Sequence, residues 1–163
     1  MMRKFNTLLN HLIERILIMA MVAIVAVVCW QVFSRFIMRS PSSYTEELAR
    51  FLLIWIGVLG AAYAYRTRAH LGLDLFYEKM RPRLKHKCAI FIELIALITA
   101  SSLLIYGGAL LMLLSFDLKQ TSAALGINMG FVYLVLPLSG VLIAINCLDN
   151  LLQLAATRQK EEV

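Results

Sequence analysis

The sequence predicts an all-α integral membrane protein with four transmembrane helices and a short amphipathic helix at the membrane surface. The chain of 163 residues is 61% hydrophobic, whereas soluble domains are about 45–50% apolar. Its mean hydropathy is +0.77. Its apolar residues form long runs without charge, and about 20 such residues cross a bilayer as a helix. We expect residues 1–163 to form a single membrane domain.

Three charge-free runs are long enough to span a membrane: Ile16–Ser34, Leu94–Phe116 and Gln120–Leu148. The run Phe51–Tyr65 is shorter, but a helix from about Ser43 to Arg66 would rise about 35 Å. We therefore predict spans at about 12–37, 44–66, 88–116 and 128–152.

The first span could instead be a cleaved signal peptide, since Arg3 and Lys4 supply a basic start. Its apolar run, however, exceeds the usual 7–15 residues of a signal peptide. No small-x-small cleavage site ends it, and Trp30 with Arg35 indicates a helix that reaches an interface. We expect this span to be retained.

The start of the second span carries three charged residues, Glu46, Glu47 and Arg50. Ser43 and Glu46 fit a capping box at the start of a helix. The spacing of i, i+3 and i, i+4 lets either acid reach Arg50. Such charges form either a solvated ion pair at the surface or a paired contact with another membrane subunit. The sequence leaves both interpretations open.

Small residues recur at four-residue spacing, which lets helices approach closely. The pairs are Gly57 with Ala61, Gly60 with Ala64, and Gly126 with Gly130. We expect them to serve mainly packing within the chain.

The segment at about 70–81 is predicted to be an amphipathic helix in the membrane interface, because its apolar residues follow a helical period. After it, Glu93 is expected to pair or extend toward water at the membrane boundary. Pro137 lies inside the last apolar run, so we expect a kink or break there. No inverted repeat accompanies this break, which argues against a chain that carries a substrate alone.

Basic residues near the spans set the orientation of a membrane protein, because they favour the cytoplasmic side. Most fall in the two tails and in the connection after the second span: Arg3, Lys4, Arg15, Arg66, Arg68, Lys79, Arg81, Arg83, Lys85, Lys87, Arg158 and Lys160. The opposite side has Arg35, Arg39, Arg50 and Lys119. Both termini are therefore predicted to be cytoplasmic, with the net charge of +6 facing membrane lipids and not nucleic acid.

No catalytic, metal-binding or cofactor-binding motif occurs in the sequence. The cysteines Cys29, Cys88 and Cys147 have no metal-site spacing and are interpreted as small apolar side chains. The three histidines lie outside the apolar runs, so a haem-anchoring subunit lacks ligands. We expect neither an enzyme nor a cofactor.

The order of several short motifs resembles the small membrane subunit of the tripartite ATP-independent periplasmic (TRAP) transporters. They are WQVFSRF at Trp30–Phe36, EELAR at Glu46–Arg50, Trp55 and Gly60, then His70 and Asp74, and finally TSAALGI and VYLVLPL in the region 121–138. The resemblance covers about residues 14–155.

The resemblance implies a bacterial inner-membrane protein that works with two partners. A large multi-span permease subunit would carry the solute with sodium ions, and a soluble periplasmic binding protein would deliver it. The solute would be an organic acid such as sialic acid or a C4-dicarboxylate. The small subunit would brace the permease and take part in docking the binding protein.

The candidate interface residues are Arg35, Glu46, Glu47, Arg50, Trp55, His70 and Asp74. Two other functions remain as alternatives. A self-contained small transporter would need a polar path inside the spans, and a membrane anchor of a redox complex would need ligands within them.

Overall fold

The computed structural model describes residues 2–38, 42–67 and 82–161, and within these ranges all regular structure is helical. Four of its helical stretches are long and apolar enough to cross a membrane: His11–Phe36, Ser43–Arg66, Cys88–Asp117 and Met129–Leu154. The predicted fold class is therefore confirmed. The amphipathic helix expected at about 70–81, with His70 and Asp74, lies outside the described residues.

The first two spans are single helices, α1 (Met2–Phe36) and α2 (Ser43–Arg66). The third span combines α4 (Pro82–Thr99), the π-helix η1 (Ala100–Gly107) and α5 (Gly108–Asp117). The fourth consists of the short α6 (Met129–Tyr133) and the long α7 (Val135–Glu161).

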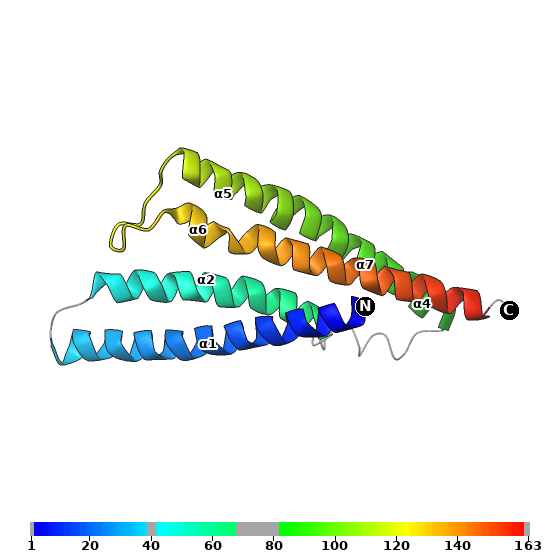
Figure 1. Ribbon diagram of the computed structural model, residues 1–163, viewed down its shortest axis with the longest axis horizontal. Coiled ribbons are helices and arrows are strands. Elements are labelled where there is room, and N and C mark those ends of the chain that lie inside the picture. The colour runs from blue at the N-terminus through cyan, green and yellow to red at the C-terminus, as the bar shows by residue number, and fades with distance from the viewer. Residues whose placement is uncertain (1, 39–41, 68–81, 162–163) are drawn as a thin grey trace.

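The spans lie side by side in a flat layer and do not close into a bundle (Figure 1). Helix α1 packs on α2, α2 packs on α7, and α7 packs on α4, η1 and α5. The fourth span is consequently the best covered. Of its most apolar stretch of 18 residues, 33% are buried, whereas none are buried in the corresponding stretch of α1. Apolar side chains of α1 such as Met19 and Val22 face outward, as is expected where lipid or another membrane protein surrounds a helix.

Close helix packing depends on glycines that the sequence pattern did not single out. A Cβ on Gly140 would lie 2.8 Å from the Leu104 Cβ and 3.0 Å from the Ile105 backbone nitrogen, so η1 and α7 nearly touch here. A Cβ on Gly108 would lie 2.7 Å from the Leu136 Cβ. Gly140 and Gly108 thus bring the third and fourth spans together.

The expected glycine pairs behave differently. Nothing lies within 4 Å of a Cβ built on Gly57 or Gly60, so these residues do not pack against another part of the described chain. Gly126 lies in the loop before α6 with φ 66°, and only Gly130 of that pair is helical, packing against the ring of Phe116. The predicted Gly126–Gly130 helix motif is therefore wrong, because the chain turns before the helix begins.

The break expected near Pro137 is present. Helix α6 ends at Tyr133 and α7 begins at Val135. Proline has no N–H to bond to the carbonyl four residues earlier, which belongs to Tyr133. The break therefore precedes Pro137 by about one helical turn.

The predicted capping box at the start of α2 is wrong. The N-cap is Ser42, and its side chain makes no capping hydrogen bond. Ser43 is already the first helical residue, and the side chain of Glu46 extends to Arg50 instead, at 3.2 Å.

We predict that Gly140→Leu destabilises the purified chain by about 1–3 kcal/mol, because the added side chain overpacks the contact with η1. Gly57→Leu is the matched control, since open space surrounds that position. Thermal unfolding in one detergent, followed by circular dichroism, measures both variants. Equal melting temperatures for the two variants would contradict the close contact at Gly140.

Candidate functional site

Two polar clusters lie at opposite ends of α2. The Glu47 cluster comprises Glu47 and the loop residues Ser122–Leu125. The Glu93 cluster comprises Tyr65, Glu93, Cys147 and Asn150. Each cluster joins α2 to segments that follow it by many residues in the sequence.

In the Glu47 cluster, one carboxylate accepts hydrogen bonds from four donors. The Ser122 hydroxyl donates to it at 2.5 Å. The backbone N–H groups of Ala123, Ala124 and Leu125 each donate at 3.0 Å. Successive N–H groups that converge in this way form a nest suited to an anion, and hydrogen bonds to a charged acceptor are the stronger kind.

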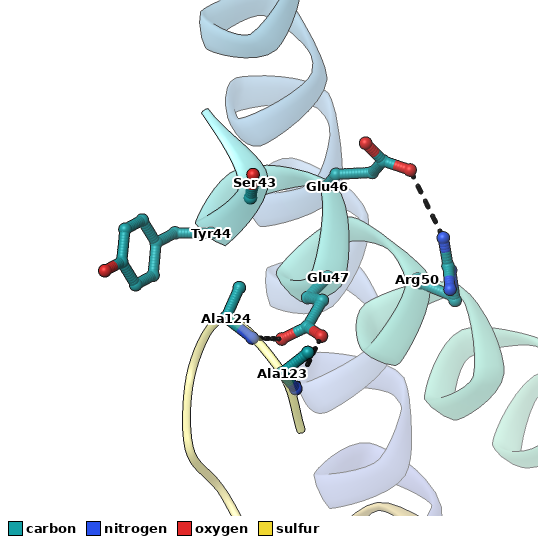
Figure 2. A pocket seen from close by; sticks show the side chains of 7 residues that line it. All are labelled: Ser43, Tyr44, Glu46, Glu47, Arg50, Ala123 and Ala124. Carbon is teal, nitrogen blue, oxygen red and sulfur yellow. Dashed lines mark hydrogen bonds and ion pairs between the residues drawn. The ribbon is translucent and has the colours of Figure 1, made fainter. Parts of the chain in front are cut away.

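The sequence predicted that both acids at the start of α2 can reach Arg50. Glu46 does so, with 3.2 Å between its Oε1 and the guanidinium. Glu47 instead points to the loop, as Figure 2 shows with Glu46 and Arg50 on another side of the helix. The two neighbouring acids therefore have different partners: one an exposed arginine, the other the backbone of a distant loop.

The loop that receives Glu47 has its own internal hydrogen bonds. Thr121 and Asn128 form an isolated bridge, and the Ser122 N–H donates to the Ile127 carbonyl at 2.9 Å. The positive φ of Gly126 lets the chain reverse between them. The Asn128 side chain then accepts from the Gly130 N–H and caps α6. These bonds hold the three donor N–H groups in place for the carboxylate.

The end of α5 brings the chain into this loop through a tight helix stop. The Gln120 N–H donates to the Ser115 carbonyl and the Lys119 N–H to the Phe116 carbonyl, both at 3.0 Å. This pair of bonds is the Schellman motif. Lys119 takes the left-handed conformation, with φ 48°, at a position that glycine usually occupies.

An open cleft of about 500 Å³ adjoins the Glu47 cluster (Figure 2). It is lined by Ser43, Tyr44, Glu46, Glu47, Arg50, Ala123 and Ala124. The side chains of Glu46 and Arg50 are 61% and 65% exposed, and Tyr44 is exposed as well. The cleft therefore offers one carboxylate, one guanidinium and one phenol to the surroundings, while the carboxylate of Glu47 is already engaged.

In the Glu93 cluster, three helices meet through hydrogen bonds. The Tyr65 hydroxyl of α2 donates to Glu93 of α4. The Asn150 amide of α7 donates to the same carboxylate at 2.9 Å, and the thiol of Cys147 donates to the Tyr65 oxygen at 3.2 Å. Cys147 is fully buried and has a polar partner, so the interpretation as an apolar filler was incomplete for this cysteine.

The other predicted interface residues lie apart from both clusters. Arg35 is exposed in the last turn of α1, and Trp55 is half-buried in the middle of α2. His70 and Asp74 lie outside the described residues. Within the ranges that the structure describes, no three His, Cys, Asp or Glu side chains come together as metal ligands.

Sequence reasoning missed most partners in the two clusters. Three of the four donors to Glu47 are backbone groups, which every residue carries, so no residue type marks them. Tyr65 and Asn150 carried one available signal, since each is a polar side chain near the end of an apolar span. Their pairing depends on helix neighbours that the sequence did not define.

Comparisons with known proteins give a consistent result. The family model described as "Tripartite ATP-independent periplasmic transporters, DctQ component" matches residues 24–157. The sialic acid TRAP transporter small permease protein SiaQ of Vibrio cholerae is 27% identical over 158 residues, which cover 94% of this chain and 87% of that protein.

Two further relatives differ in how much of their length is matched. The isethionate TRAP transporter permease protein DctMQ of Oleidesulfovibrio alaskensis is 28% identical, over 83% of this chain but 22% of that protein. The C4-dicarboxylate TRAP transporter small permease protein DctQ of Rhodobacter capsulatus is 28% identical, over 65% of this chain and 46% of that protein.

Proposed function

This chain belongs to the DctQ component family of the TRAP transporters, and we propose that it braces a large permease subunit that carries an organic acid across the bacterial inner membrane. The family is one of transporter subunits and not of enzymes. The proposal therefore concerns what this subunit contributes to transport.

The flat arrangement of the four spans is the observation that carries the proposal. A chain that moved a solute alone would enclose a polar path. Here the spans form one layer, and no residue in the most apolar stretch of its outer helix α1 is buried. A layer of this kind offers long apolar surfaces to a neighbour in the bilayer. A carrier that moves during transport needs such a fixed neighbour.

The length of one relative supports a large partner. This chain matches 22% of the isethionate permease protein, so the matching segment of that protein is joined to a much longer remainder. We propose that a large permease subunit supplies the corresponding part here. We also propose a periplasmic binding protein as the third component.

The names of the relatives support the class of solute. They include sialic acid, isethionate and C4-dicarboxylate transporters, whose solutes are all organic anions. We propose sialic acid or a C4-dicarboxylate as the solute here, with uptake coupled to sodium. The solute and ion sites would lie in the large subunit.

The exposed pair of Glu46 and Arg50 is our proposed contact at the cleft with the permease or the binding protein. Its charges are accessible, and an arginine at the centre of an interface often accounts for much of the binding free energy. Arg35 and Trp55 are further candidates for contact on α1 and α2. His70 and Asp74 are proposed as contact residues from the sequence alone.

Reconstitution tests the proposed function. Liposomes that contain this chain, the large permease and the binding protein should take up the organic acid when a sodium gradient is imposed. Liposomes with this chain alone should take up none. Uptake by the chain alone would contradict the subunit role and support a self-contained transporter.

We predict that Arg50→Ala lowers uptake in this assay on the order of tenfold, as loss of a central interface arginine does. Arg15→Ala is the matched control, because it removes another exposed basic side chain away from the cleft. Unchanged uptake and unchanged yield of the complex with Arg50→Ala would rule out a contact through this residue.

We propose that both termini are cytoplasmic and that the start of α2 faces the periplasm. The distribution of basic residues supports this orientation. A cysteine at Ser42 should then react with a membrane-impermeant thiol reagent added to the outside of spheroplasts. Reaction only after the reagent is given access to the cytoplasmic side would reverse the orientation.

A further inference from the structure

The described chain divides into two halves that meet along a narrow seam. One half is α1 with α2, and the other is α4, η1, α5, α6 and α7. The halves meet mainly where α2 packs on α7, with a smaller contact between α2 and α6. What holds this seam decides whether the subunit moves as one body or as two.

The middle of the seam has no charged residue on α2, since Phe51–Tyr65 is free of them. In a bilayer, apolar side chains gain little by exchanging lipid for one another, so helix association relies on close packing and polar contacts. Among the residues that the structure describes, hydrogen bonds cross the seam near both of its ends, at Glu47 and at Tyr65. These bonds therefore define how far α2 slides or turns against α7.

We propose that the Glu47 and Glu93 clusters are two clamps that lock the halves of the subunit in one register. Glu47 reaches from α2 to the loop between α5 and α6, and Glu93 reaches from α4 to Tyr65 on α2. The purpose of such a lock, a rigid brace for a moving permease, rests on the proposed function. The lock itself is a property of this chain alone.

The spacing of the two clamps explains why both are needed. Glu47 and Tyr65 are about 27 Å apart along the axis of α2. A single attachment point lets one helix pivot on another, whereas two distant points prevent both pivoting and sliding. The clamps also differ in kind, since one binds α2 to a loop and the other binds three helices together.

Each clamp resists opening because it supplies hydrogen-bond donors to a carboxylate near an apolar region. Glu47 accepts from four donors and Glu93 from two. Hydrogen bonds to a charged acceptor are the stronger kind, and opening a clamp breaks several of them at once. Opening either clamp is therefore unfavourable while its partners remain.

Hydrogen exchange of the purified chain tests the first clamp. In Glu47→Gln, the amides of Ala123, Ala124 and Leu125 should exchange on the order of tenfold faster, because the charged acceptor is lost. Glu46→Gln is the matched control, since the neighbouring acid bonds to Arg50 and not to the loop. Equal exchange of these amides in both variants would overturn the first clamp.

Distances between spin labels test the lock as a whole. Labels at the exposed positions Leu53 on α2 and Leu113 on α5 report on the two halves, in a chain whose Cys29 and Cys88 are replaced by alanine. The wild-type distance distribution should be narrow. Tyr65→Phe combined with Glu47→Gln should widen or shift it, while Tyr63→Phe combined with Glu46→Gln should not.

These conservative substitutions change no side-chain volume substantially, and unchanged circular dichroism verifies that the helices remain. An unchanged, narrow distribution in the double clamp variant would overturn the lock and leave the subunit role standing. Failure to find a permease partner would overturn the proposed function and leave the lock standing. A wild-type distribution that is already broad would likewise contradict the lock.

Discussion

The bond between the Glu47 carboxylate and the loop at Ser122–Leu125 is the interaction on which the arrangement at this end of the molecule depends. It joins residues more than 70 positions apart in the sequence. The tight stop after α5, the turn at Gly126 and the cap of α6 all position donors for this carboxylate. A membrane protein cannot rely on hydrophobic association between helices, so a satisfied carboxylate is an effective point of attachment.

The flat layer of helices follows from the same constraint. Helices in lipid need no compact core, because lipid covers apolar side chains as well as a neighbouring helix does. The chain uses glycine where helices must approach, at Gly108 and Gly140, and leaves Gly57 and Gly60 open. This shape agrees with membership of the DctQ component family, because a small subunit with broad apolar faces is suited to pack beside a larger membrane protein.

The sequence predicted the helical membrane fold, the family and the break before Pro137. Composition, motif order and the missing proline N–H are visible in the sequence without knowing which helices become neighbours. It did not predict the partner of Glu47, because backbone donors in a folded loop have no residue-type signature. The capping box at Ser43 failed because the helix starts one residue earlier than that motif requires, so that Ser42 is the N-cap. The Gly126–Gly130 motif failed because its first glycine serves a turn. The pairing of Glu93 with Tyr65 and Asn150 depends on which helices are neighbours, and patterns within one stretch of sequence do not define that.

The central claim is that this chain works as the small subunit beside a larger permease. The most direct measurement is native mass spectrometry of the tagged chain, extracted from its own membrane in mild detergent. We expect a complex of fixed stoichiometry with a much larger multi-span protein. A chain that is recovered alone from membranes that still transport the organic acid would contradict it.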